Sequence, residues 1–166
     1  MKRAASFAAV AVVLAGLAGA CAQTSSADAT TKHLSIVGQD AKATTLEQVD
    51  LGKAGFGPGD ELIEENPATD SAGANVAKLY TIVTMTSGKS MADAVGIIDC
   101  HVVWSDGSTV LFNGKVALKD LGSGVTLPVT DGTGAYNGAG GTAHMQAPDQ
   151  KRTNISFDLL IPTVAK

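Results

Sequence analysis

The sequence predicts an all-β protein built from about eight short antiparallel strands. Apolar residues alternate with polar ones at a period of two, and turn-forming residues recur at intervals of about ten to twenty positions. Hardly any stretch shows a helical period. Many short strands with regular turns fold as a sandwich or as a closed barrel. With 166 residues, 45% of them apolar, the chain can form one domain with a stable core.

The clearest strand covers residues 153–161, where apolar side chains and Thr153 share one face and polar side chains share the other. Further strands are predicted at residues 34–37, 61–64, 76–86, 95–104, 108–118, 125–129 and 138–147. Pro128 cannot donate a ladder hydrogen bond, so its strand is predicted to be an edge or a bulged strand. Residues 44–51 are the one segment with a helical alternative, and they fit a loop equally well.

The turns support the strand assignment. Asp106 and Gly107 lie between two apolar runs, and an Asp-Gly pair in that position is a strong hairpin signal. Residues 55–60, 87–89, 113–114 and 131–134 contain further turn-forming residues. The sequence therefore predicts that consecutive strands are joined by short turns.

The N-terminus is predicted to direct export. Lys2 and Arg3 precede an uncharged apolar run at residues 7–20, which has the length of a signal-peptide core. Two processing routes fit: lipidation of Cys21, because residues 17–21 resemble a bacterial lipobox, or cleavage after an A-x-A site. We therefore divide the chain into a signal peptide (1–21), a polar tether (22–31) and a β domain (32–166). The expected location is the cell envelope, for a lipoprotein, or the exterior, for a secreted protein.

Charge and cysteine content narrow the function classes. The formal net charge is −4 and no basic run occurs, which argues against nucleic acid as a partner. The two cysteines are Cys21 and Cys100, so lipidation or removal of Cys21 leaves no intrachain disulfide. The three histidines are scattered and no C-x-x-C spacing occurs, so no metal is assigned.

Residues 59–161 resemble the allene oxide cyclase/dirigent superfamily in its small bacterial branch. The strongest match is residues 129–141, which are similar to the family's Gly-Gly-Thr-Gly, aromatic, Gly-Ala-x-Gly signature, with Asp131 in place of the first Gly. Residues 59–67, residues 79–80 together with 95–97, and residues 157–159 add support. The glycines of the signature, Gly132, Gly134, Gly138 and Gly141, are interpreted first as a structural turn.

The resemblance implies an eight-stranded antiparallel β-barrel with an apolar cavity. It also implies a function without metal or organic cofactor, in which a reactive small molecule is held in one conformer and closes or couples along one path. Plant cyclases of the superfamily carry a carboxylate and an amide on the first strand. The corresponding strand here, residues 34–38, contains neither. Plant relatives also imply a homo-oligomer.

The candidate site residues fall into two groups. The acid–base candidates are Asp99, His101 and Glu61. Asp99 and His101 share one strand face while Cys100 shares the other, and either face could line the cavity. The candidate ligand-binding residues are Tyr80, Cys100, Trp104, Phe112 and Tyr136. Each has an alternative as an ordinary surface or core residue, and a lone strand cysteine is usually a small buried hydrophobe.

Two function hypotheses follow from these observations. In the first, the protein binds a small apolar molecule and guides its cyclisation or stereoselective coupling, as a cofactor-independent isomerase or cyclase would. This hypothesis requires a cavity with a few polar groups converging in an apolar wall. In the second, it is a non-catalytic envelope lipoprotein that binds a ligand or a partner, or is purely structural. That hypothesis predicts a barrel filled by its own side chains.

Overall fold

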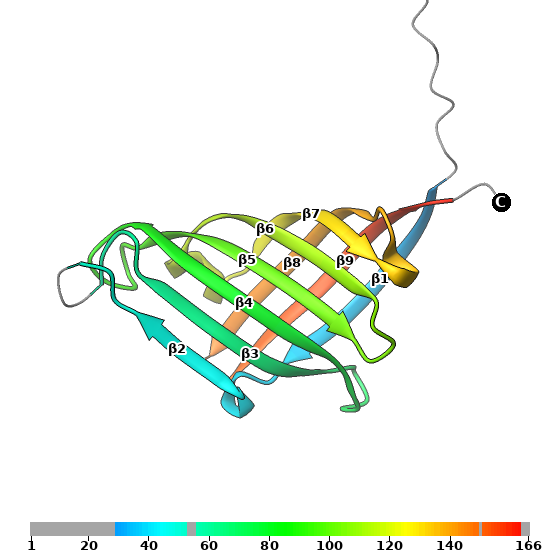
Figure 1. The fold of residues 1–166 in the computed structure, drawn as a ribbon, viewed down its shortest axis with the longest axis horizontal. Helices are drawn as coiled ribbons and strands as arrows, with labels where there is room; N and C mark the ends of the chain where they lie inside the picture. Colours follow the sequence, from blue (N-terminus) through cyan, green and yellow to red (C-terminus); the bar gives the residue numbers. More distant parts are fainter. Residues whose placement is uncertain (1–28, 53–55, 150, 164–166) are drawn as a thin grey trace, which may run out of the picture.

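The computed structural model describes residues 29–52, 56–149 and 151–163, and within them the chain forms an antiparallel β-barrel (Figure 1). The strands are β1 (Ala29–Gly38), β2 (Thr45–Val49), β3 (Glu61–Thr69), β4 (Asn75–Ser87), β5 (Val95–Trp104), β6 (Thr109–Ala117), β7 (Val125–Thr133), β8 (Gly140–Asp149) and β9 (Arg152–Pro162). Three short 3-10 helices connect them: η1 (Asp40–Lys42), η2 (Leu118–Gly122) and η3 (Gly134–Tyr136). None of the helices in these ranges has the length and apolar character of a membrane span.

The barrel closes where β1 meets β3. Strands β3 to β9 pair with their sequence neighbours, and β1 pairs with β9 along its whole length. At the far end of β1, Val37 and Gly38 pair with Thr69 and Ala68 of β3. Eight strands therefore form a closed wall, as the sequence predicted. β2 pairs with the first half of β3 only, and no second strand partner lies in the described part of the chain.

The barrel centre is filled by the inward-facing side chains. Alternate residues along β4, β5 and β9 are buried, as expected for strands with one face on a core. The largest fully buried side chains are Phe112, Phe157, Leu79, Ile98, Ile155, Leu159, Val102, Val110, Asn66 and Cys100. Most of the buried side chains are therefore apolar, and the polar exceptions include Asn66, Thr81 and Thr153.

Three segments differ from the sequence prediction. Residues 113–114, expected at a turn, lie inside β6 and pair with β5. Thr45–Val49, expected as a short helix or a loop, is strand β2, because pairing with Glu61–Glu65 satisfies its backbone groups on one side. β1 begins at Ala29, so residues 29–31 of the predicted tether belong to the barrel wall. The signal peptide and Cys21 lie outside the described residues.

The strand that contains Pro128 was predicted to be either an edge strand or a bulged strand, and the structure shows the second. β7 lies between β6 and β8, so it is not an edge strand. The register between β6 and β7 shifts at Leu111 and Phe112, which pair with Asp131 and Val129 and leave Thr130 as the extra residue. β7 is therefore a bulged strand, and the bulge lies two residues beyond the proline.

Candidate functional site

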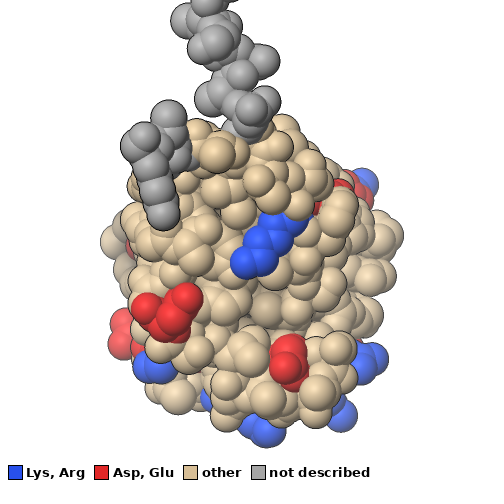
Figure 2. All heavy atoms as spheres, turned by 90° about the vertical axis from the view of Figure 1, so that its right-hand side faces the viewer, with Lys and Arg blue, Asp and Glu red and all other residues tan. Residues whose placement is uncertain are grey.

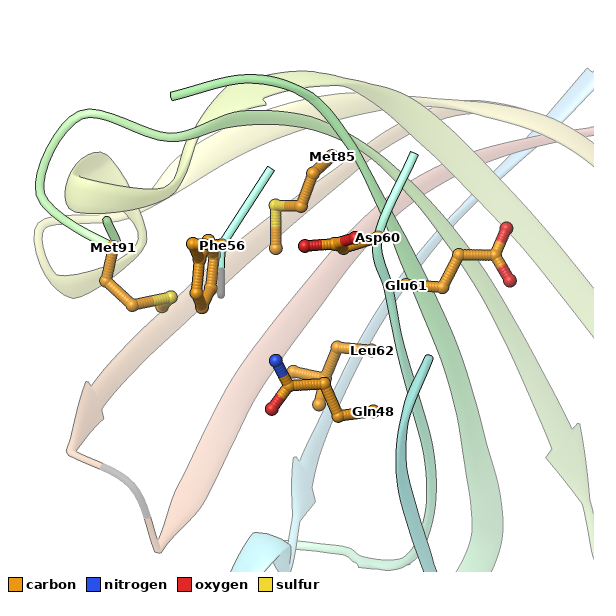
Figure 3. A pocket seen from close by; sticks show the side chains of 7 residues that line it. All are labelled: Gln48, Phe56, Asp60, Glu61, Leu62, Met85 and Met91. Carbon is orange, nitrogen blue, oxygen red and sulfur yellow. The ribbon is translucent and has the colours of Figure 1, made fainter. Parts of the chain in front are cut away.

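A pocket of about 110 Å³ opens at one end of the barrel, which we call the mouth (Figure 3). It lies beside the start of β3 and the end of β4. Its lining residues are Gln48, Phe56, Asp60, Glu61, Leu62, Met85 and Met91. Four of these side chains are apolar, and two are flexible methionines that adapt to differently shaped contacts. The pocket is about the size that accommodates a single small ring.

Asp60 holds the loop that forms one wall of the pocket. Its carboxylate is buried and accepts hydrogen bonds from the backbone N–H groups of Leu51 (2.9 Å) and Gly57 (2.7 Å). The backbone N–H of Gly59 donates to the carbonyl of Met85 at 2.8 Å, which ties the same loop to the end of β4. These bonds fix the loop that carries Phe56 at the mouth.

Polar side chains continue from the pocket into the barrel along β3. Leu62, Glu64 and Asn66 alternate with the outward-facing residues of the strand, so they form one inward row. Glu64 is half-buried, whereas Asn66 is only 1% exposed. The row therefore runs from the apolar pocket wall through a carboxyl group to a fully buried amide.

Asp40 joins this row at the seam where the barrel closes. Its two carboxylate oxygens accept hydrogen bonds from Asn66 Nδ2 (2.9 Å) and from Thr153 Oγ1 (2.8 Å). The contacts link η1 to β3 and β9. Asn66 Oδ1 has no hydrogen-bond partner among the described residues. The seam is therefore well bonded except at this one buried oxygen.

Burial raises the pKa of the Glu64 and Asp40 carboxyl groups. The pKa of Glu64 is raised above its ordinary value, mainly by desolvation, then by the charge of Asp40, while hydrogen bonding to Asn66 partly offsets the rise. The pKa of Asp40 is also raised, mainly by desolvation, against the lowering effect of its bonds to Thr153 and Asn66. A carboxyl group with a raised pKa beside a pocket can act as a proton donor or acceptor.

The opposite end of the barrel, which we call the closed end, is filled by aromatic rings. The Trp104 ring packs against Tyr136 with centroids 4.7 Å apart and against Phe157 at 6.1 Å. Phe112 meets Phe157 edge to face at 5.5 Å, and Lys32 Nζ lies 4.7 Å from the Tyr136 ring centroid. Figure 2 views this end and shows a largely uncharged surface with a basic side chain across its middle. These rings occupy the space that a ligand would need.

The three acid–base candidates do not come together inside the barrel. Asp99 and His101 lie on the outer face of β5, where His101 is exposed and Asp99 is half-buried. Glu61 lines the mouth pocket, but its strand position faces outward and Thr84 Oγ1 donates to it at 3.3 Å. Of the three, Glu61 alone is therefore next to the pocket.

The five candidate ligand-binding residues are also separated. Tyr80 lies on the outer face of β4. Phe112, Tyr136 and Trp104 form the packed closed end, and none of them lines the mouth pocket.

Cys100 faces the barrel interior and is 1% exposed. Its Sγ lies 3.7 Å from Thr81 Oγ1. Burial raises the pKa of the Cys100 thiol to about 12. The side chain therefore behaves as part of the core.

The glycine signature forms the turn between β7 and β8. A Cβ on Gly132 would lie 2.3 Å from the Tyr136 carbonyl oxygen, and a Cβ on Gly141 would lie 2.0 Å from the Asp158 carbonyl oxygen. Gly134 and Gly138 have positive φ angles of 60° and 69°. The turn needs glycine for close backbone approach and for left-handed conformations, and it places Tyr136 over the closed end.

Sequence reasoning missed the residues that form the mouth. Glu61 was selected from the sequence and Glu64 was not, because nothing local indicated which face of this strand points inward. The sequence did not mark the inward face as apolar, because the residues that the structure places there include Glu64 and Asn66. Met85 and Met91 belong to no sequence motif that would have marked them as pocket residues. Among the described residues, no group of three or more His, Cys, Asp or Glu side chains lies close enough together to hold a metal ion.

The fold matches solved structures, although no family model and no curated protein sequence matches the chain. Pyocyanin demethylase is 17% identical, with a TM-score of 0.62, over 78% of this chain and 99% of that chain. The pterocarpan synthase dirigent protein GePTS1 is 18% identical, with a TM-score of 0.61, over 93% and 98%. The Diels–Alderase AbmU from Streptomyces koyangensis is 17% identical, with a TM-score of 0.60, over 84% and 71%.

These similarities define the class of protein at the level of fold. The chain has the barrel fold shared by a dirigent protein and a Diels–Alderase, which confirms the fold that its resemblance to the allene oxide cyclase/dirigent superfamily implied.

Proposed function

We propose that this protein is an exported barrel that binds a small apolar molecule at its mouth and guides that molecule's cyclisation or stereoselective coupling without a cofactor. One observation carries the proposal: an apolar pocket opens at the mouth, and its lining residue Leu62 is followed on the same inward face of β3 by the half-buried carboxyl group of Glu64. The solved structures of the same fold that guide ring-forming reactions support it.

The chemistry would come from confinement and from one acid–base group. Phe56, Leu62 and the two methionines exclude water from one side of a bound molecule and limit its conformers. The raised pKa of Glu64 keeps a proton on its carboxyl group at higher pH than usual. Glu64 would then donate that proton to, or accept one from, the reacting molecule.

Binding is tested with toluene, a neutral probe of one ring, followed by NMR on the full chain. Met91→Trp should fill the pocket and weaken toluene binding by about tenfold or more. Leu160→Trp is the matched control, because Leu160 is as exposed as Met91, at 52%, and is not a pocket residue. Equal toluene binding by both variants and by the parent protein would contradict a site at the mouth.

The proposed guiding of stereoselective coupling is tested separately from ligand binding. A small 4-substituted phenol is coupled by an added one-electron oxidant in the presence of the protein, and chiral chromatography measures the ratio of product enantiomers. The proposal expects an excess of one enantiomer that Met91→Trp abolishes and Leu160→Trp keeps. A racemic product with a probe that binds would remove the guiding role.

A second candidate function has its own support in the packed barrel centre. The fully buried side chains of Phe112, Phe157 and Leu79 fill the space that a large ligand would occupy. The mouth pocket, at about 110 Å³, is also smaller than the roughly 300 to 1,000 Å³ typical of ligand sites. Both facts favour a non-catalytic envelope lipoprotein, and failure of toluene to bind would select it.

Export is tested by the mass of the mature protein. A diacylglyceryl mass on Cys21 in membrane-extracted protein would support the lipoprotein route. A mass that begins after residue 20 or 22 without lipid would support secretion. A mass that includes residues 1–20 would overturn the proposal of export.

A further inference from the structure

We infer that Asp60 is the positioning residue of the mouth pocket: its carboxylate holds the Phe56 ring in place as a wall that limits the ligand to a single ring. The inference rests on the proposed function, because it assigns the element that sets the ligand size of the same pocket. It is carried by the hydrogen bonds of Asp60 and by the place of Phe56 in the pocket wall.

The carboxylate of Asp60 joins the two chain segments on either side of Phe56. Its Oδ1 accepts a hydrogen bond from the N–H of Leu51 at 2.9 Å, and its Oδ2 accepts one from the N–H of Gly57 at 2.7 Å. Leu51 precedes Phe56 in the chain, and Gly57 follows it. Asp60 is 3% exposed, so its carboxylate is shielded from water. Each oxygen therefore fixes one side of the loop that carries the ring.

The backbone of Asp60 is attached to the barrel. The N–H of Met85 donates to the carbonyl of Asp60 at 2.8 Å, and the N–H of Gly59 donates to the carbonyl of Met85 at 2.8 Å. These two bonds continue the pairing of β3 with β4 beyond Glu61. The Asp60 side chain thus ties the loop to a fixed point on the barrel wall.

The described residues that flank Phe56 have few packing contacts of their own. The Leu51 side chain is 58% exposed, and Gly57 has no side chain. A Cβ added to Gly52 would meet no described atom within 4 Å. One further bond, from the N–H of Asp60 to the carbonyl of Gly57 at 3.2 Å, involves the same residue. The position of the loop therefore depends mainly on Asp60.

The Phe56 ring completes the pocket beside the barrel wall. Leu62 and Met85 belong to strands β3 and β4, whereas Phe56 comes from the loop and packs partly against the core. Figure 3 shows the ring between the side chains of Met85 and Met91. With the ring there, the pocket encloses about 110 Å³, the size of one small ring. A displaced ring would leave that side open and admit a larger molecule.

The bonding requires a carboxylate, because the two N–H donors approach different oxygens. In Asp60→Asn one oxygen becomes an NH₂ group, which is a donor and cannot accept a hydrogen bond. That group would face the N–H of Leu51 or of Gly57. One side of the loop would then be released although the side chain keeps its size.

Asp70→Asn is the matched control. Asp70 also accepts two backbone N–H groups, from Ala72 at 2.9 Å and from Ala74 at 3.0 Å, but a single oxygen, Oδ1, accepts both. The amide of asparagine keeps one such oxygen, so both bonds can remain. Asp70 lies in the turn between β3 and β4 and is not a pocket residue.

Toluene and naphthalene, with one ring and two, test the size limit in the full chain. NMR follows the Met85 and Met91 methyl groups in each titration. The parent protein should bind toluene about tenfold or more tighter than naphthalene. Asp60→Asn and Phe56→Ala should both weaken toluene binding and reverse the preference, whereas Asp70→Asn should keep it. A general loss of stability would lower both affinities by the same factor and leave the preference unchanged.

Hydrogen exchange of the Leu51 and Gly57 amides measures the loop itself. Both N–H groups should be protected in the parent protein and in Asp70→Asn, and at least one should exchange faster in Asp60→Asn. If Asp60→Asn does not fold, Phe56→Ala decides the size limit, and the two amides of the parent protein decide whether the carboxylate holds the loop.

The outcomes separate the inference from the proposed function. If the parent protein binds both probes equally, or Asp60→Asn keeps the parent's preference, the role of Asp60 is wrong while the binding site stands. If toluene does not bind the parent protein, the proposed function fails and the inference fails with it.

Discussion

Both ends of the barrel are built from strands whose residues alternate between the inner and outer face, but one end is filled by aromatic side chains and the other is left partly open. At the closed end, the Trp104 ring packs against Tyr136 and Phe157 in tilted contacts that complete the core. At the mouth, β2 pairs with β3 only, and Leu46 and Met91 remain 64% and 52% exposed. The comparison indicates that the closed end supplies stability, whereas the mouth leaves apolar and acidic groups available to a ligand.

The cause of the difference lies in which elements cover each end. The glycine turn between β7 and β8 brings η3 across the closed end and buries Tyr136 there. The mouth is covered by a loop held at Asp60, and that loop leaves a recess above Leu62 and Met85.

The largest expected effect is on stability at the closed end. Phe157→Ala should lower the free energy of unfolding by about 3–5 kcal/mol, because it removes a fully buried ring and leaves a cavity. Met91→Ala at the mouth should change it by about 0.5 kcal/mol or less, since half of that side chain is already exposed. Urea unfolding measures both, and equal losses would erase the distinction between the ends.

The reactivity of the Cys100 thiol tests whether the barrel interior is closed to solvent. With its pKa raised to about 12 by burial, only about one thiol in ten thousand is ionised at about pH 8. In a Cys21→Ser variant, which leaves Cys100 as the one thiol, a disulfide reagent should therefore react with native protein about a thousandfold more slowly than with unfolded protein. Rapid reaction with the native protein would show that the centre is open, in contradiction to the packing described above.

The glycine turn gives an intermediate effect. Gly132→Ala should destabilise the protein by about 1–3 kcal/mol, because the added Cβ meets the Tyr136 carbonyl oxygen at 2.3 Å. Gly140→Ala is the matched control, since a Cβ there meets nothing within 4 Å. Thermal unfolding compares the two, and a neutral Gly132→Ala would show that the turn does not hold the closed end.

The smallest effect is a pH dependence at the mouth. The pKa of Glu64 is higher in the folded protein than its ordinary value of 4.5, so the unfolded chain releases this proton first as pH rises. Stability from this group is therefore full below about pH 4.5 and is lost as pH rises through the folded pKa. Glu64→Gln should lack that loss, so its stability relative to the parent protein should increase with pH.

Glu65, one residue away, should give a pH dependence of stability with the opposite sign. The hydrogen bond from Lys78 holds the pKa of Glu65 below its ordinary value, so its contribution is lost as pH falls through the folded pKa. Glu65→Gln should therefore be less stable than the parent protein at neutral pH, and this difference should disappear as pH falls through the folded pKa. The same trend in both variants would contradict the assignment of Glu64 to the interior.

The sequence was sufficient for the fold because its signals are local. Alternation along residues 153–161 and the Asp106-Gly107 turn both depend on neighbouring residues, and the strands and the hairpin are found there. β2 was missed because pairing with β3, a contact between distant residues, decides its conformation.

The candidate site was harder to predict for a geometric reason. A strand's alternation separates two faces but does not say which one points inward, so Asp99 and Cys100 were both candidates. The mouth also combines a loop, an edge strand and the end of β4, and no motif connects Phe56 with Met85. Asn66 shows its unpaired oxygen only when η1, β3 and β9 are assembled around it.

The central claim is that the mouth, and not the closed end, holds the ligand. The most direct test is a benzyl alcohol titration of the full chain in which NMR follows the Met85 and Met91 methyl groups and the Trp104 indole N–H. We expect saturable shifts of both methyl groups with one affinity and no change at Trp104. Shifts at Trp104 with unchanged methyl groups would place the ligand at the closed end and contradict the claim.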